Sequence, residues 1–155
     1  NLAPLLAGSE GTLAVIRKVT LNLVRRPRHT VLAVLGYAGI DSACDDVPRL
    51  LDCGPSAIEL IPRSIVRLAK SVPAYAVQAS LLDIGAEALL VVEFSGDDPS
   101  ELVRAARALE PSLVAESPVD QARIWNVRKV GLGLLASALY LAFRKGRRRD
   151  SGGTS

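Results

Sequence analysis

The segment Gly8-Ser9-Glu10-Gly11-Thr12 has the residue types of a loop that presents backbone N–H groups to a ligand. Two glycines enclose a short polar turn, and glycine adopts positive φ without a steric penalty. The N–H groups that such a turn exposes suit an anionic group such as a pyrophosphate. A plain turn before a β-branched run uses the same residue types, so these residues alone leave both interpretations open.

Arg128 is the second residue whose type suggests chemistry. It lies in the segment 121–129 (Gln-Ala-Arg-Ile-Trp-Asn-Val-Arg-Lys), for which we predict a helix capped by Asp120. A guanidinium can hold a carboxylate through two parallel hydrogen bonds. The alternative is a surface arginine that pairs with a nearby acidic side chain. Trp125 lies on the same helix face, and we predict that it packs into the core.

Other side chains offer less. Glu10 is not predicted to be a catalytic acid, because no second carboxylate is paired with it. Cys44 and Cys53 are the two cysteines of the chain, with no further ligands at metal-site spacing. We predict no metal site, and we expect both cysteines to be small buried side chains in a reducing compartment.

Strands and helices alternate along the part of the chain that must position these residues. The patterns predict strands over 13–24, 30–37, 57–61, 88–94 and 112–115, and helices over 41–52, 63–70, 99–109 and from 121 onward. Asp41 and Asp98 are the predicted N-caps, and Pro48 should shorten or kink its helix. This order predicts an α+β fold, a ferredoxin-like split βαβ unit with an antiparallel sheet covered by helices on one face.

The glycine loop resembles the G-S-E-G-T-L-G segment of FAD-linked oxidases of the vanillyl-alcohol oxidase type, which include glycolate oxidase and D-lactate dehydrogenase. Four later segments resemble the substrate-cap portion of that family and follow in its order: 55–60, 90–94, 97–99 and 121–129. The resemblance implies that residues 1–27 end an FAD-binding domain and that 28–135 form an incomplete C-terminal cap domain. Its partner would be the remainder of the FAD-binding domain. The chain starts at Asn1 and has no methionine, so we expect a fragment.

The resemblance also assigns roles to residues. Gly8, Ser9, Gly11 and Thr12 match the loop that contacts FAD, and Ile16 matches its apolar neighbour. Arg128 matches an arginine that binds the substrate carboxylate in family members that oxidise 2-hydroxy acids. The implied function is FAD-dependent oxidation of a small 2-hydroxy acid, of the D-lactate or glycolate type, by hydride transfer to the flavin. Ala14 replaces the usual glycine, and the family's histidine-containing metal segment has no counterpart here.

Charge is concentrated at the end of the chain. Residues 144–150 hold five basic side chains and one acid, while the net charge of the whole chain is +3. The near-neutral remainder has no basic stripe interleaved with aromatics, which argues against nucleic-acid binding. Residues 136–155 depart from the family pattern as an apolar run followed by a basic tail. The run 130–143 is short of the ~20 residues that span a bilayer.

Two interpretations of this ending stay open. The tail could lie on an anionic membrane surface, or it could come from a shifted reading frame or a truncated gene. We expect a cytoplasmic protein, with peripheral contact to the inner membrane if the tail binds the membrane surface. The alternative function is a non-catalytic, cap-like module that carries this membrane-seeking tail.

Overall fold

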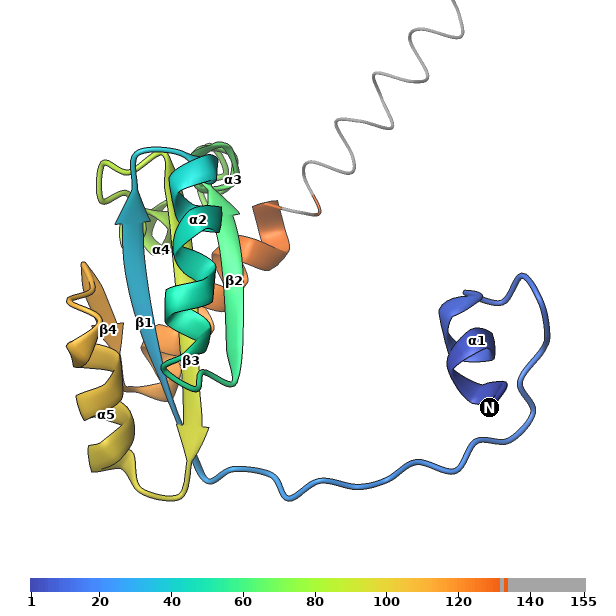
Figure 1. The fold of residues 1–155 in the computed structure, drawn as a ribbon. Coiled ribbons are helices and arrows are strands. Elements are labelled where there is room, and N and C mark those ends of the chain that lie inside the picture. Colours follow the sequence, from blue (N-terminus) through green and yellow to red (C-terminus); the bar gives the residue numbers. More distant parts are fainter. Residues whose placement is uncertain (132, 134–155) are drawn as a thin grey trace, which may run out of the picture.

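The computed structural model describes residues 1–131 and 133, and its centre is a four-stranded antiparallel sheet. The strands are β1 (His29–Tyr37), β2 (Ala57–Pro62), β3 (Ala88–Gly96) and β4 (Leu113–Ala115), in the order β2-β3-β1-β4. One strand–helix–strand unit contains α2 (Ile40–Leu51), and the other contains α5 (Pro99–Ala108). This order of interleaved strands confirms the predicted α+β, ferredoxin-like class (Figure 1).

The two central strands pair along their whole length. The register of β1 against β3 runs from His29 opposite Gly96 to Tyr37 opposite Ala88. Each strand carries an unbroken apolar run, residues 31–35 in β1 and 88–92 in β3, and all of these residues are buried. Because successive side chains of a strand point to opposite faces, such runs require cover on both sides of the sheet.

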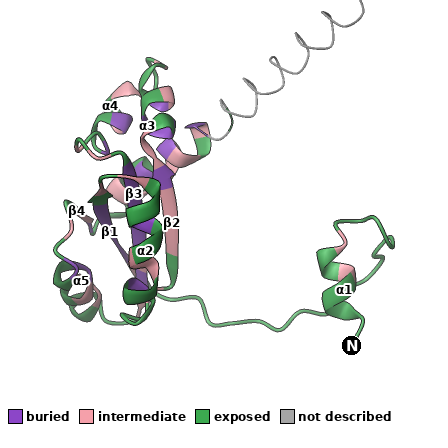
Figure 2. Cartoon of the chain, turned by 45° about the horizontal axis from the view of Figure 1, so that its top comes forward, coloured by how far each residue is buried: buried purple, intermediate pink, exposed green. Residues whose placement is uncertain are grey.

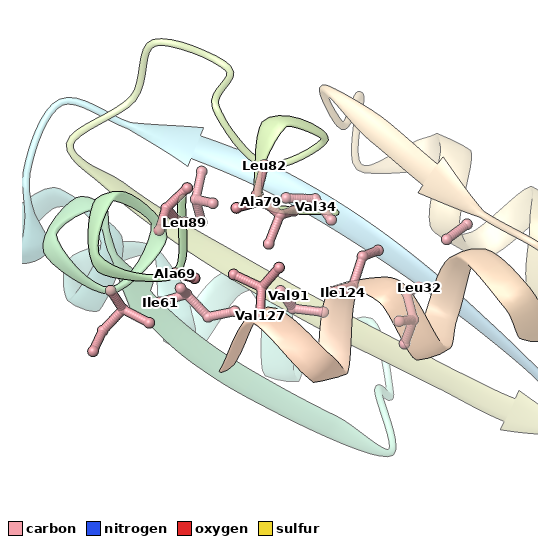
Figure 3. Packing of buried hydrophobic residues seen from close by; sticks show 13 residues of the cluster. Leu32, Val34, Ile61, Ala69, Ala79, Leu82, Leu89, Val91, Ile124 and Val127 are labelled. Atoms are coloured by element: carbon pink, nitrogen blue, oxygen red, sulfur yellow. The ribbon is translucent and has the colours of Figure 1, made fainter. Parts of the chain in front are cut away.

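Helices do cover both faces, so the prediction of helices on one face is wrong. On one face, α2 and α5 pack over Val31 and Ala33. On the other, Leu32 and Val34 pack with residues of α3 (Arg63–Lys70), α4 (Ala76–Ser80) and a last helix over residues 118–131 (Figure 3). We call this last element helix 118–131. The sequence pattern left the region of α4 unassigned.

Two of the three predicted helix caps are wrong. The Asp98 carboxylate accepts a hydrogen bond from the Ser100 N–H, as expected for the N-cap of α5. Helix α2 begins two residues earlier than its predicted N-cap implies, at Ile40 with Gly39 as the N-cap, so Asp41 lies in the first turn. Helix 118–131 is capped by Ser117, whose hydroxyl accepts the Asp120 N–H and donates to the Asp120 carboxylate. Helix α2 is not shortened by its internal proline, and it extends to Leu51.

The first 28 residues lie outside the packed fold. After α1 (Ala3–Gly8), residues 10–29 are all exposed (Figure 2). The predicted strand over 13–24 does not form, and its apolar side chains face solvent, with Val15 93% and Leu23 94% exposed. A strand forms only when a neighbour supplies its hydrogen bonds, and among the described residues none lies beside this segment. Arg25 and Arg28 pair with Asp97 at 3.3 and 3.9 Å, close to the start of β1.

Two further expectations concern the cysteines and the tail. Cys44 and Cys53 are exposed, so the prediction of buried cysteines is wrong: both lie on or just after α2, outside its core-facing stripe. The predicted tail over 136–155 lies outside the described residues. Of the helices within the described ranges, none is long and apolar enough to cross a membrane.

Candidate functional site

The glycine loop forms a tight turn directly after α1. The Ser9 carbonyl accepts hydrogen bonds from the Thr12 N–H at 2.9 Å and from the Thr12 hydroxyl at 2.7 Å. Between them, Glu10 and Gly11 have φ of 48° and 83°, as in a type I′ turn. Positive φ is therefore carried by Gly11, as the sequence allows, and by Glu10 in place of Gly8.

This turn leaves donors free for an anion. In the described chain, the N–H groups of Glu10 and Gly11 have no acceptor. Within the part of the chain that the structure describes, a Cβ atom added to Gly8 or Gly11 would meet nothing within 4 Å, so the backbone is open to close approach. The donor set therefore fits part of a flavin dinucleotide, although the turn alone encloses nothing. Ile16, its predicted apolar neighbour, is 59% exposed.

Helix 118–131 positions Arg128. Ile124 and Val127 lie on its inner face, are almost fully buried, and pack on the sheet (Figure 3). At the start of the helix, Gln121 Nε2 donates to the carbonyls of Thr30 at 2.6 Å and Glu116 at 3.1 Å. These contacts fix the helix to the sheet.

Arg128 pairs with an acid. Its Nε donates to Oε1 of Glu59 in β2, and the two side chains are 38% and 32% exposed. Glu59 stands opposite Val91 in the register of β2 against β3. The guanidinium thus lies at the rim of the buried cluster, partly open to solvent.

The pairing of Arg128 with an acidic side chain is what the alternative interpretation of the sequence expected, but the identity of the partner, Glu59, escaped the sequence analysis because the two residues are 69 positions apart. A signal was present: alternation within β2 places Glu59 on the same face as the buried Ile61, which is the face that helix 118–131 covers. Trp125 is half-buried and packs against the cluster on this face, as predicted.

A second carboxylate lies near this pair. Glu93 of β3 stands opposite Ala57, two residues from Glu59 along β2 and on the same face. Its Oε1 accepts a hydrogen bond from the Ser56 hydroxyl at 2.8 Å. Glu93 therefore has its own partner and makes no bond to Arg128.

The structure does not bring the two predicted sites together. Hydrogen bonds of the glycine loop stay within residues 6–12, while Arg128 contacts β2. Figure 1 shows α1 at the end of an extended segment, away from the sheet. No group of three or more His, Cys, Asp or Glu side chains in the described part of the chain could hold a metal ion.

A separate polar cluster joins β1 to α2. The Tyr37 hydroxyl donates to Asp46 Oδ2 at 2.6 Å, and Arg49 donates to both Asp46 oxygens at 2.6 and 2.7 Å. The hydrogen bonds from Arg49 and then Tyr37 lower the pKa of Asp46 to about 2. Burial and the neighbouring Asp46 carboxylate raise the pKa of Tyr37 above its usual 10.0. These mutually satisfied groups are structural.

Comparison with known proteins places most of the chain in one family. The pattern of "FAD linked oxidases, C-terminal domain" matches residues 26–143. The chain is 29% identical to D-2-hydroxyglutarate dehydrogenase of Escherichia coli (strain K12), over 89% of this chain and 15% of that protein.

Two D-lactate dehydrogenases also match. That of Anaerostipes hadrus is 27% identical over 83% of this chain and 30% of its own length. The mitochondrial D-lactate dehydrogenase (cytochrome) of Arabidopsis thaliana is 28% identical, over 85% of this chain and 24% of its own length. The chain therefore spans less than a third of each of these three relatives.

Proposed function

Because the chain belongs to the family of the C-terminal domain of FAD-linked oxidases, we propose that it supplies the substrate-side part of an FAD-dependent 2-hydroxy-acid dehydrogenase. The relatives above are named for D-2-hydroxyglutarate and D-lactate. Both compounds carry a carboxylate next to the carbon that bears the hydroxyl and loses hydride. The substrate class we propose is a small 2-hydroxy acid of the D-lactate or glycolate type.

The observation that carries this proposal is Arg128, a partly exposed guanidinium on an anchored helix. We propose that it binds the carboxylate of the substrate. A planar guanidinium can form two parallel hydrogen bonds to a carboxylate, which fixes the orientation of the carbon next to it. Holding a reactant in one orientation lowers the entropic part of the barrier.

We propose that Gly8, Ser9, Gly11 and Thr12 contact FAD, with Ile16 as an apolar neighbour. Support comes from the free N–H groups of the turn and its open backbone. When bound, FAD supplies the hydride acceptor. The chain's own contribution is then to bind and orient both compounds.

The division of the chain follows as a proposal. Residues 1–27 would complete an FAD-binding domain, 28–135 would form the cap, and 136–155 would be a tail, of which the family pattern still matches residues 136–143. Exposure of the apolar side chains at 15–24 supports this division, because burial of such a surface is favourable. We also propose a cytoplasmic protein that touches the membrane peripherally through the basic residues 144–149, which only the sequence supports.

The test is flavin reduction without oxygen. The longest gene product that contains this chain would be loaded with FAD and mixed with D-2-hydroxyglutarate, D-lactate or glycolate, with glutarate and propionate as controls that lack the hydroxyl. We expect at least one hydroxy acid to bleach the flavin absorbance and neither control to do so. Bound FAD that no 2-hydroxy acid reduces would contradict the proposal. The 155-residue chain alone should retain no stoichiometric FAD, because its loop encloses nothing.

A further inference from the structure

We propose that Glu59 is a positioning residue for Arg128, and that it determines which edge of the guanidinium meets the substrate. The inference rests on the proposed role of Arg128 and extends it to a second residue. Glu59 accepts the hydrogen bond from Nε, which leaves Nη1 and Nη2 to bind a carboxylate end-on.

Glu59 is well placed to act as a fixed acceptor. It lies within β2, whose register against β3 runs without a break from Ala57 opposite Glu93 to Pro62 opposite Ala88. Two residues later on the same face, Ile61 is 1% exposed and anchors the strand in the core. The carboxylate therefore projects from a backbone that the sheet holds in place.

The backbone of Arg128 is fixed just as firmly. Val127 immediately before it is fully buried, and Ile124, one turn earlier, is 1% exposed. One turn later, Gly131 lies against Ile65 of α3. With both backbones held, the flexible part of the pair is the arginine side chain, and its Nε bond to Glu59 restrains that side chain.

Because Glu59 restrains the arginine side chain through Nε, the geometry of the guanidinium determines which of its edges can bind a carboxylate. Arginine offers one N–H at Nε and two at each Nη, so a carboxylate can be held side-on through Nε and one Nη or end-on through both Nη atoms. Glu59 occupies Nε, which removes the side-on mode. In the described structure, Nη1 and Nη2 have no protein acceptor. The end-on mode is the one left for a substrate.

The charge of Glu59 works in the opposite direction to its hydrogen bond. A carboxylate beside Arg128 offsets part of the positive charge that attracts an anionic substrate. The hydrogen bond restricts orientation, which favours reaction over binding. Removal of the charge and removal of the acceptor should therefore have different kinetic effects.

Three substitutions separate these effects in the FAD-loaded protein. Glu59→Gln keeps an acceptor oxygen for Nε and removes the charge, so we expect kcat within about threefold of wild type and an unchanged or lower KM. Glu59→Ala removes the acceptor, and kcat should fall by roughly 10- to 100-fold, the effect of a misplaced binding group. Glu93→Ala is the matched control, because Glu93 lies on the same face and pairs with Ser56. It should leave kcat unchanged.

A second measurement needs neither flavin nor turnover. In ¹⁵N NMR spectra of the 155-residue chain, the Arg128 Nε–H should be protected from exchange in wild type and Glu59→Gln, and it should lose that protection in Glu59→Ala. Added D-2-hydroxyglutarate should shift the Nη resonances while the Nε–H stays protected. Loss of Nε protection on ligand addition would show that the substrate displaces Glu59 and would overturn the proposal.

The two proposals fail in different ways. If Arg128→Lys has wild-type kcat/KM, the role of Arg128 itself is wrong. If Arg128→Lys is impaired while Glu59→Ala matches Glu93→Ala in kcat, Arg128 binds substrate without help from Glu59, and the positioning role is wrong.

Discussion

Gly131 lies directly against Ile65, so the backbone of helix 118–131 comes close to the backbone of α3 at this point. A Cβ atom placed on Gly131 would come within 2.3 Å of Ile65 Cγ2 and 3.2 Å of the Ile65 carbonyl oxygen. No side chain larger than hydrogen fits unless one helix moves. Because Arg128 is one turn away on the same helix, this contact also limits where its guanidinium can lie.

We expect Gly131→Ala to destabilise the fold by about 1–3 kcal/mol, the usual cost of overpacking a core. Alanine is the better helix former by about 1 kcal/mol, but the contact with Ile65 should outweigh that gain. Urea denaturation followed by circular dichroism would give the difference in the free energy of unfolding.

The control for this substitution is Gly133→Ala. Among the described residues, a Cβ on Gly133 meets nothing within 4 Å, so the variant should unfold at the same or a higher urea concentration than wild type. Equal stability of Gly131→Ala and wild type would mean that the helices separate at no cost.

Arg128→Lys should impair use of a 2-hydroxy acid and leave flavin content unchanged. Lysine keeps the charge but loses the two-pronged geometry, at a cost of about 1–3 kcal/mol, or roughly 5- to 150-fold in kcat/KM. Steady-state kinetics with lactate, glycolate and 2-hydroxyglutarate would measure it. Reduced flavin content would instead assign Arg128 a structural role.

The Tyr37–Asp46 contact should make stability depend on pH at both extremes. The pKa of Asp46 is lowered to about 2 in the folded state, so its contribution is present above the usual pKa of 3.8 and is lost as pH falls toward 2. The pKa of Tyr37 is raised above 10.0, so its contribution is present below pH 10 and is lost as pH rises further. Thermal unfolding across pH 2–11 would show both losses.

Two variants test the losses of stability at low and at high pH separately. Tyr37→Phe should lose less stability than wild type between pH 10 and 11, because it has no hydroxyl to ionise in the unfolded state. In Asp46→Asn, stability should depend less on pH between pH 4 and 2 than it does in wild type. Parallel curves for wild type and Tyr37→Phe above pH 10 would rule out the tyrosine as the cause.

Limited trypsin digestion should cut first between residues 17 and 25. Arg17, Lys18 and Arg25 lie in the exposed segment that has no helix or strand, and proteases prefer such segments. Mass spectrometry should find a persistent fragment that begins between 18 and 26; cuts at 144–149 are also expected from the sequence. Early cleavage within α3, at Arg63 or Arg67, would mean that the packed fold opens readily.

Local sequence signals were sufficient for much of this fold. The bounds of α3 match those predicted, and the Asp98–Pro99 start of α5 is confirmed, because caps and helical periodicity are properties of neighbouring residues. The loop at 8–12 was likewise recognisable from its glycines.

Long-range relations were beyond the sequence. Alternation along β2 gives the face on which Glu59 lies, but no local pattern shows that helix 118–131 packs over that face and brings Arg128 to it. The alternation at 19–23 is typical of a strand, but a strand also needs a partner, and the described chain supplies none. The second layer of helices could have been inferred from β1, because its unbroken apolar run puts apolar side chains on both faces of the sheet, and both faces must then be covered.

The central place of β1 has a consequence for biosynthesis. Among the four strands of the sheet, β1 leaves the ribosome before the others, and its neighbours β3 and β4 both come later, with roughly fifty residues between β1 and β3. At about 5–20 residues per second, β1 with its buried apolar run waits roughly 3–10 s for a partner. During that interval it is a target for chaperones and for aggregation, so the yield of active protein should depend on translation speed across residues 38–87 as well as on final stability.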